Sequence, residues 1–472
     1  MQNSPQFFGG KEGPFREVTI AGGGLAGCEA AWQLAGRGVR VVLYEMRPHV
    51  MTPAHVTGLL GELVCSNSLK STSMNNASGI LKREMEIGGS LVLQAAFASR
   101  VPAGSALAVD RRLMGEKITH VIENHPLIKV RREVVEELPE GPAIIATGPL
   151  TGGALAERLS EAASVPLYFY DAIAPIVETE SIDLDNAFFA SRWEKEASES
   201  PDQPPRGDYI NCPLSLEEYE DFIESLLSGE QVPPHSFEEP RFFEGCLPIE
   251  VMASRGSDVL RHGPMRPVGL RDPNTGRRPY AVVQLRAENK GATAHNMVGF
   301  QTRLKYGEQK RIFRKIPALR NARFLRLGSI HRNTYLRAPD CLEDDLVLQN
   351  TEDIRVAGLL CGVEGYMEST AMGWLVGIIT AIRLAELDFH PPPPSTATGA
   401  LYAYIRRSLM EDEIFTPTNM NLSLFPEPAT KGKRVPKKLR RIMIAERAEK
   451  EFKSWLSTLD QEIGGKSLRV SE

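Results

Sequence analysis

The chain has 472 residues, 42% of them hydrophobic and 24% charged, a composition typical of a water-soluble globular protein. Its formal net charge of −5 excludes a uniformly basic nucleic-acid-binding protein, so any RNA-binding surface must be a local patch. The length exceeds that of one ordinary domain, so we expect two domains, or one domain with an insertion.

Several further features of the sequence point to a cytoplasmic protein. The first 15 residues lack the charged and apolar segments of a signal peptide, and the most apolar late stretch is too short to cross a membrane. None of the six cysteines forms a C-x-x-C pair or a His–Cys cluster with zinc spacing. We therefore expect free thiols and no metal.

The first predicted element is a βαβ unit that carries a dinucleotide fingerprint. Residues 18–21 form a short apolar strand, residues 28–35 an alanine-rich helix, and residues 39–44 a second strand. The turn between the first strand and the helix matches G-x-G-x-x-G and places backbone N–H groups at the start of the helix, where a pyrophosphate binds. Its residues are Gly22, Gly23, Gly24, Leu25, Ala26 and Gly27. Glu45 ends the second strand, where a carboxylate accepts hydrogen bonds from an adenosine ribose.

The middle of the chain changes character twice. Residues 65–78 are rich in Ser and Asn and are predicted to form a loop, and residues 143–146 form an apolar strand that leads into Thr147-Gly148-Pro149. From about residue 181 the composition shifts, with a proline-rich linker over residues 198–208 and a capping-box helix start at Ser215. Residues 230–330 contain short apolar runs separated by Gly and Pro, which predicts β-rich structure.

A second glycine turn near the other end of the chain completes the expected architecture. Residues 354–360 form a strand that leads into Gly362, Glu364, Gly365 and Tyr366, and a long helix begins at about Glu368. A last helix is predicted over residues 436–459. We expect an α/β fold with a Rossmann-like FAD-binding domain built from both chain ends, residues 1–180 and 328–472. An inserted α+β domain is expected over residues 181–327.

Two cysteines stand in sequences that suit reactive thiols. Cys65 lies among Ser, Asn and Lys residues, and nearby cations and amide donors favour the reactive thiolate form of cysteines in general. Cys246 follows Gly245 between apolar residues, with Glu244 and Glu250 beside it as possible proton carriers. For either cysteine alone, a buried structural thiol is the more common role.

Two basic stretches contrast with the acidic average. Residues 303–326 contain nine Lys or Arg residues, one acid and three interleaved aromatic residues, and residues 431–441 contain seven Lys or Arg and no acid. Positive charge interleaved with aromatic side chains suits a folded RNA with an exposed base. The common alternative is a solvated helix face or tail.

Taken together, the motifs resemble those of the folate- and FAD-dependent tRNA (uracil-5-)-methyltransferases. The resemblance rests on residues 22–27, 64–71 (VCSNSLKS), 243–250 (FEGCLPIE), 279–286 (PYAVVQLR), 298–302 (VGFQT), 331–334 (HRNT), 362–369 (GVEGYMES) and 415–425 (FTPTNMNLSLF). It extends from about residue 18 to residue 458. Thr293-Ala294-His295-Asn296 departs from the pattern expected before VGFQT.

The resemblance implies both an activity and roles for residues. In that family, 5,10-methylenetetrahydrofolate supplies a carbon to C5 of the T-loop uridine of tRNA, reduced FAD takes part, and NAD(P)H re-reduces the flavin. Cys246 matches the family's proposed nucleophile and Cys65 a second cysteine close to the flavin. Glu244 or Cys65 is a candidate base for the C5 proton, and His331 and Asn333 are candidate folate contacts.

Other functions stay open on the sequence alone. The same chemistry could act on ribosomal RNA, and related flavoproteins modify the wobble uridine of tRNA. A flavin-bound RNA-binding protein without catalysis is a further alternative. The sequence does not fix the oligomeric state.

Overall fold

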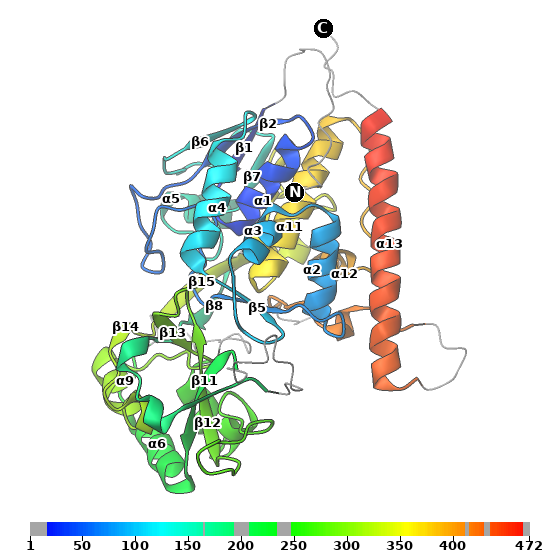
Figure 1. Cartoon of the computed structure of the whole chain (residues 1–472). Helices are drawn as coiled ribbons and strands as arrows, with labels where there is room; N and C mark the ends of the chain where they lie inside the picture. Colours follow the sequence, from blue (N-terminus) through cyan, green and yellow to red (C-terminus); the bar gives the residue numbers. More distant parts are fainter. Residues whose placement is uncertain are drawn as a thin grey trace.

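The chain folds into two lobes joined by a two-stranded ribbon (Figure 1). The structure, a computed structural model, describes residues 17–163, 166–192, 207–233, 247–410, 415–428 and 435–465. The upper lobe in Figure 1 holds a parallel sheet and most of the helices, and the lower lobe holds an antiparallel sheet. Each lobe has a hydrophobic core of its own.

The upper lobe is built around a parallel sheet in the order β16-β7-β1-β2-β6. Its apolar runs are buried, as expected of strands that helices cover on both faces. After β1 the chain adds β2 and β6 on one side of it and then crosses to add β7 and β16 on the other side, and ligands bind at such a switch point. The strands are β1 (Glu17–Ala21), β2 (Arg40–Tyr44), β6 (Ile128–Arg131), β7 (Ala143–Ile145) and β16 (Ile354–Val356).

Two helices from opposite ends of the chain pack closely over this sheet. Glycines at two positions of α11 (Tyr366–Leu384) face α1 (Leu25–Ala35), and a Cβ on Gly373 would lie 2.2 Å from the carbonyl oxygen of Ala26. Gly377 meets Ala30 in the same way, so only glycine allows this approach of the two backbones.

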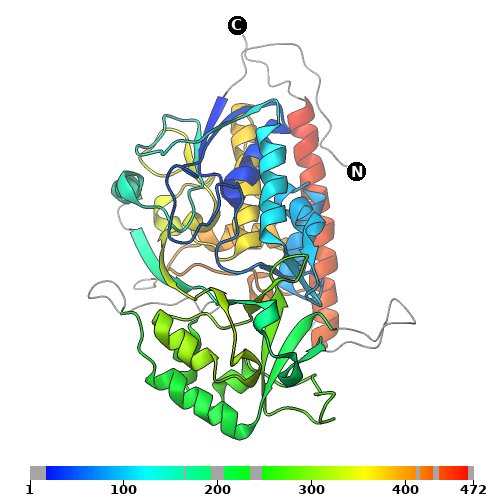
Figure 2. The ribbon, with the colours of Figure 1, turned by 60° about the vertical axis from the view of Figure 1, so that its left-hand side comes forward.

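The remaining helices of the upper lobe surround this pair. The long helix α13 (Lys437–Gly465), red in Figure 2, runs beside α2 (Ala77–Ile87). Trp374 of α11 packs against Phe452 and Trp455 of α13. The others are α3 (Leu91–Ala98), α4 (Arg111–Glu123), α5 (Gly153–Ala163), α10 (Ala338–Cys341) and α12 (Ala397–Arg406).

The lower lobe contains an antiparallel sheet in the order β10-β11-β12-β13-β9-β14. The predicted capping box at Ser215 is present and starts α6, whose apolar face covers the sheet. The strands are β9 (Ile176–Glu178), β10 (Phe188–Ala190), β11 (Tyr209–Leu214), β12 (Ala281–Ala287), β13 (Ala294–Met297) and β14 (Phe324–Arg326). The helices are α6 (Leu216–Ser228), α7 (Ile249–Ser254), α8 (Val259–His262) and α9 (Tyr306–Phe313).

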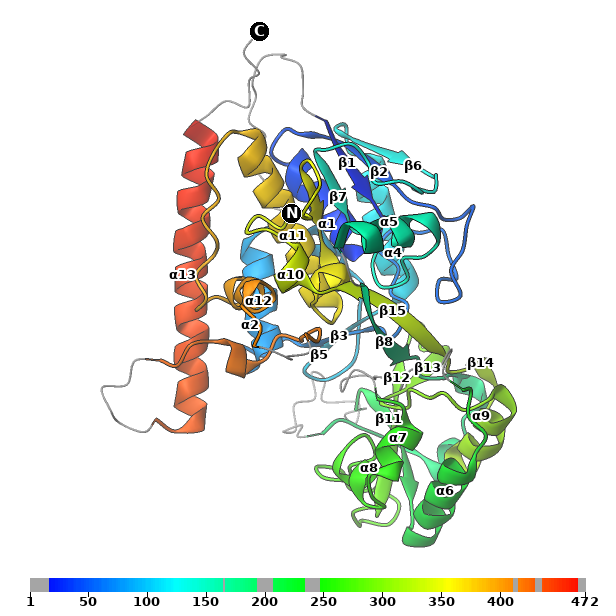
Figure 3. The same cartoon turned by 180° about the vertical axis from the view of Figure 1, so that it is seen from behind.

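The ribbon between the lobes pairs β8 (Pro166–Ala172) with β15 (Ile330–Leu336), which Figure 3 shows running from the upper lobe toward the lower one. Elements before β8 and after β15 both belong to the parallel-sheet lobe. The predicted α/β fold, with a Rossmann-like domain built from both chain ends and an insertion between them, is therefore confirmed. The boundaries at residues 180/181 and 327/328 stay a prediction.

The predicted loop over residues 65–78 is partly wrong. Ser68–Ser71 forms strand β3, which pairs with β5 (Ala106–Val109) and through it with β4 (Arg100–Val101), and α2 already begins at Ala77. Ser and Asn have low intrinsic strand propensity, but pairing with a distant strand overrides it.

Candidate functional site

The turn between β1 and α1 has the geometry of a phosphate-binding loop. Gly22 has a φ of +107°, and a Cβ there would lie 2.5 Å from the carbonyl oxygen of Ala146. A Cβ on Gly27 would lie 1.9 Å from the carbonyl oxygen of Gly22, whereas a Cβ on Gly24 would meet nothing within 4 Å. Gly24 caps α1 without a side-chain hydrogen bond, so the first N–H groups of the helix stay available to an anion.

Glu45 lies beside this turn but is already engaged by protein groups. Its carboxylate accepts hydrogen bonds from the backbone N–H of Gly23 at 3.0 Å and from the Arg47 side chain at 2.8 and 3.0 Å. Burial opposes the ionisation of Glu45, but the bonds and charge of Arg47 outweigh it and lower the pKa of the carboxyl. The predicted ribose contact of Glu45 stays a prediction.

The second glycine turn brings the other chain end to the same place. Gly362 and Gly365 have φ values of +89° and +111°, and a Cβ on Gly362 would lie 2.4 Å from the ring of Phe415. The backbone N–H of Glu364 donates to the carbonyl oxygen of Thr418 at 2.8 Å. Gly365 caps α11 without a side-chain bond, so a second helix N-terminus points at the site.

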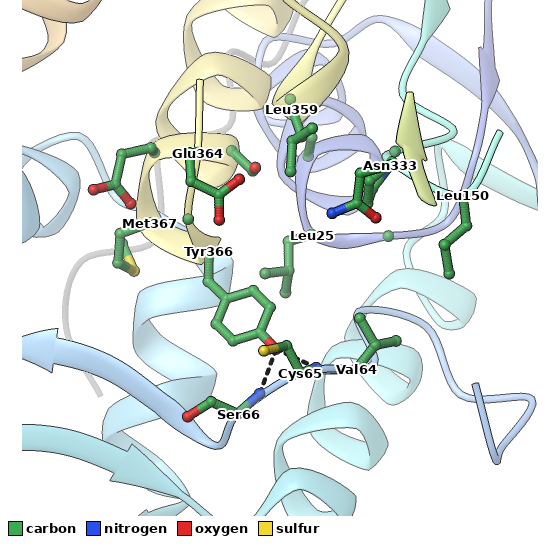
Figure 4. Close-up of a pocket in the computed structure, with 18 of the residues that line it drawn as sticks. Leu25, Val64, Cys65, Ser66, Leu150, Asn333, Leu359, Glu364, Tyr366 and Met367 are labelled. Carbon is green, nitrogen blue, oxygen red and sulfur yellow. Dashed lines mark hydrogen bonds between the residues drawn. The ribbon is translucent and has the colours of Figure 1, made fainter. Parts of the chain in front are cut away.

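A cavity of about 340 Å³ lies between the two turns, within the usual size range of ligand pockets. Figure 4 shows Leu25, Cys65, Asn333 and Tyr366 gathered around it. Most of its wall comes from residues 24–26, 64–66, 68–70, 146–150, 358–359 and 364–369. The cavity therefore joins the fingerprint, the Cys65 segment and the second turn, which lie far apart in the sequence.

Cys65 is held in this cavity through its backbone. The hydroxyl oxygen of Tyr366 accepts hydrogen bonds from the N–H groups of Cys65 at 2.8 Å and Ser66 at 3.0 Å, as Figure 4 shows. Burial raises the pKa of the Tyr366 hydroxyl, which therefore stays neutral. The thiol itself is half-buried, with Sγ 3.8 Å from the carbonyl oxygen of Ala172.

Two arginines also hold the Cys65 segment, and both connect it to the lower lobe. Arg286 on β12 donates to Asn67 Oδ1 at 2.8 Å and Ser66 Oγ at 2.9 Å. Arg111 on α4 donates to Glu288 at 2.9 and 3.1 Å and to the carbonyl oxygen of Cys65 at 3.4 Å. The Cys65 segment is thus held where the lobes meet.

The other predicted site residues divide into two groups. Asn333 on β15 is buried and lines the cavity, as Figure 4 shows. Cys246, Glu244 and the side chain of His331 lie outside the described residues. The described chain resumes at Leu247, and the N–H of Ile249 donates to the carbonyl oxygen of Gln301, a cavity-lining residue, at 2.7 Å.

Sequence reasoning missed a polar cluster in the same cavity. Lys70 donates to Glu368 Oε1 at 3.0 Å and also contacts Asn419 Oδ1. Lys70 has a φ of +64°, a strained conformation for a lysine that is typical of functional sites. All three residues fall inside motifs quoted above, but no spacing rule connects them, because their contacts span about 300 residues or more.

Ion pairs reduce the charge of the first basic stretch. Carboxylates within 4.0 Å engage Arg303, Lys305, Arg311, Lys315 and Arg323. Lys310, Arg314, Arg320 and Arg326 have no carboxylate at that distance in the described part of the chain. Of the second stretch, the structure describes residues 435–441, in which Arg440 pairs with Glu427.

Residues 17–388 match the family model described as glucose inhibited division protein A. The chain belongs to this family. It also belongs with the relatives named methylenetetrahydrofolate–tRNA-(uracil-5-)-methyltransferase. The Geobacter sulfurreducens protein is 54% identical over 94% of this chain and 99% of its own length. The Geotalea uraniireducens protein is 53% identical, again over 94% of this chain and 99% of its own length.

The solved structures agree with the family at the level of the fold. A crystal structure of Aquifex aeolicus GidA superposes with a TM-score of 0.67 over 96% of this chain and 76% of that chain, at 16% identity. At that identity the likeness shows the fold alone.

The family binds FAD, and the residues of this chain fit that cofactor. Gly24 and Gly148 border open space, because a Cβ on either residue would meet no atom within 4 Å. The N-termini of α1 and α11, which have no side-chain caps, also face the cavity. Such space and free N–H groups suit a pyrophosphate and a flavin edge.

Two other kinds of site are absent from the described residues. Nowhere in these ranges do three or more His, Cys, Asp or Glu side chains come together as a metal site would require. None of the helices in the described ranges combines the length and the hydrophobicity that a membrane crossing needs.

Proposed function

We propose that this protein transfers the one-carbon unit of 5,10-methylenetetrahydrofolate to C5 of the T-loop uridine of tRNA, giving 5-methyluridine. The observation that carries the proposal is the position of Cys65, whose backbone is fixed by Tyr366 inside the cavity that the two dinucleotide turns frame. Relatives at 50–54% identity that carry this activity in their names support it.

A cysteine is needed because C5 of uracil is a poor nucleophile. When a thiolate adds to C6, the S–C6 bond forms and the C5=C6 electron pair moves toward C5 and O4 as an enolate. C5 then bonds to the methylene carbon, and a base removes the C5 proton as the bond from that carbon to the folate nitrogen breaks and releases tetrahydrofolate. Two electrons and a proton turn the methylene on C5 into a methyl group, and the S–C6 bond breaks as the C5=C6 double bond returns. We assign the addition to Cys246, with Cys65 or Glu244 as the base.

The remaining residues bind and orient. Residues 22–27 and Gly362, Glu364 and Gly365 would hold FAD, and Asn333 and His331 would contact the folate. Reduced FAD, when bound, would supply the two electrons that turn a methylene into a methyl group, and NAD(P)H would restore them. Tyr366 and Arg111 keep the Cys65 backbone in place, so its thiol stays at the cavity wall.

The test is transfer of label to RNA. Purified protein should place carbon from labelled 5,10-methylenetetrahydrofolate on a tRNA transcript in the presence of NAD(P)H, and nucleoside analysis should find 5-methyluridine. A transcript with cytidine at the target position should stay unlabelled. Label on ribosomal RNA but not on tRNA, or on neither, would refute the proposal.

The assignment of the thiols needs separate variants. Cys246→Ala and Cys65→Ala should each lower turnover at least 100-fold while the protein keeps its flavin absorbance. Cys341→Ala, which removes a buried thiol outside the cavity, should keep turnover within about twofold. RNA that carries 5-fluorouridine should trap a covalent adduct, and an adduct on neither Cys246 nor Cys65 would contradict the assignment.

A further inference from the structure

The rim of the cavity carries a surface that the chemistry above does not use. The segment after β2, residues 47–57, is called the rim loop here; Ala54 and His55 of this loop line the cavity. Arg326, on β14 of the lower lobe, donates to the carbonyl oxygen of Ala54 at 3.2 Å. The rim loop thus lies where the two lobes meet, and in Figure 3 the blue segment after β2 descends toward β14.

Arg326 differs from the other cations of its stretch. Among Lys310, Arg314, Arg320 and Arg326, the four without a close carboxylate in the described ranges, it alone has a recorded hydrogen bond to a cavity-lining residue. It is only partly exposed, and burial together with the nearby charge of Arg111 lowers the pKa of its guanidinium. A desolvated cation of this kind is well placed to bind an anion that enters from outside.

The other ionisable groups at the rim either have protein partners of their own or are neutral. Glu62 accepts hydrogen bonds from Arg47, at 3.0 Å, and from the backbone of the rim loop. Glu288 is held by Arg111. Burial and then the charge of Arg47 lower the pKa of His55 to about 4, so this ring is neutral at pH 7. Arg326, which has no carboxylate within 4.0 Å in the described ranges, can therefore bind an anionic group of a ligand at the rim.

The rim loop, whose Ala54 carbonyl oxygen binds Arg326, also exposes apolar side chains. Val50, Met51 and Val56 are 46%, 43% and 71% exposed. The loop is nevertheless ordered by local bonds, because Thr52 and His55 share a hydrogen bond of 2.6 Å and Glu62 accepts from the N–H of Val56 at 2.9 Å. An ordered loop with exposed apolar groups and one desolvated cation matches the chemistry of RNA with unstacked bases.

We propose that the rim loop and Arg326 contact the RNA around the uridine that enters the cavity. Arg326 binds a backbone phosphate next to the extruded nucleotide, and Val50, Met51 and Val56 cover the base faces that extrusion exposes. This inference rests on the proposed function, because it takes a loop of RNA as the substrate of the same cavity. It adds residues that bind the RNA but take no part in the methyl-transfer reaction.

The charge is tested with Arg326→Gln and the matched variant Arg320→Gln, which removes a cation of the same stretch that also has no carboxylate within 4.0 Å in the described ranges. With a T-loop hairpin RNA, Arg326→Gln should raise KM about tenfold, the loss expected for one charge-assisted hydrogen bond. The slope of log(kcat/KM) against log[salt] should become shallower by about 0.7, as for one lost phosphate contact. Arg320→Gln should change neither quantity, and Arg326→Lys should recover part of the loss.

The apolar contacts are tested with Val56→Ser, an exposed position where folding is not at risk. It should weaken binding of the hairpin at least threefold without changing the salt slope, because it removes a contact without charge. Flavin absorbance and NAD(P)H-dependent flavin reduction without RNA should match the wild type in all variants. Unchanged RNA binding by Arg326→Gln and Val56→Ser, or equal losses in Arg320→Gln, would overturn the inference.

Measuring RNA binding separately from 5-methyluridine formation distinguishes a failure of this inference from a failure of the proposed function. If wild-type protein binds the hairpin and the variants weaken that binding, but no 5-methyluridine forms, the proposed function fails and the RNA surface stands. If 5-methyluridine forms at equal rates and with equal KM in all variants, the surface fails and the proposed function stands.

Discussion

At the scale of single residues, the glycines of the fingerprint have different physical roles that the motif alone does not separate. Gly22 and Gly27 are required by the protein's own packing, because a Cβ at either position would collide with backbone atoms. Gly24 meets no protein atom within 4 Å of its missing Cβ, so the fold alone does not require glycine there. The space above Gly24 is the space that a pyrophosphate would fill.

This difference predicts opposite behaviour for two alanine variants. Gly24→Ala should keep the melting temperature of the flavin-free protein within about 2 °C of the wild type, since surface changes cost little. It should lower flavin affinity at least tenfold. Gly27→Ala should instead destabilise the flavin-free protein, by about 2 kcal/mol or more, because the backbone must shift. Flavin titration and thermal unfolding of the two apoproteins check this, and equal flavin affinity in Gly24→Ala would contradict it.

At the scale of elements, the sequence predicted those parts whose signals are local. The βαβ unit, the capping box at Ser215 and the helix after Gly365 follow from patterns within a dozen residues. Strand β3 could not be predicted in the same way, because Ser68–Ser71 becomes a strand only by pairing with β5, more than thirty residues further on.

One contact between elements depends on a buried carboxylate. Glu84 on α2 accepts hydrogen bonds from the N–H groups of Ala397 and Thr398 at the start of α12, at 2.6 and 2.8 Å, and from the Thr398 hydroxyl. Burial raises the pKa of Glu84 from 4.5 to about 7, although these bonds oppose the shift. The folded protein therefore holds this proton more tightly than the unfolded chain does.

The sign of the resulting pH dependence follows from linkage. Because the pKa of Glu84 is higher in the folded protein, protonation of Glu84 stabilises the folded state relative to the unfolded chain. This contribution to the free energy of unfolding is fully present below pH 4.5 and is lost as the pH rises through about 7. The stability of the wild type relative to Glu84→Gln should therefore fall between pH 4.5 and 7 and stay level above pH 7. Thermal unfolding at several pH values measures this difference. Glu86→Gln changes an exposed side chain on the same helix, and the stability of the wild type relative to this variant should vary far less with pH.

At the scale of the whole molecule, the site consists of contacts between distant parts of the chain. Tyr366 and Cys65 are 301 residues apart, and Arg286 and Asn67 are 219 apart. The motifs identified the segments that meet, but not the bonds between them, because no local pattern encodes a contact across two lobes. One of these contacts is the two-bond ion pair of Arg111 with Glu288.

That ion pair predicts how the two lobes depend on each other. Arg111→Met removes the ion-pair partner of Glu288, whose side chain is 8% exposed, and leaves this buried carboxylate without its hydrogen-bonded cation at a cost of about 3 kcal/mol. It also removes the bond to the carbonyl oxygen of Cys65. Calorimetry should resolve separate unfolding transitions for the two lobes in place of a coupled one, and turnover should fall while flavin stays bound. Arg112→Met breaks an exposed ion pair on the same helix and should cost less than about 1 kcal/mol. If both variants unfold like the wild type, the lobes are held together by contacts other than this pair.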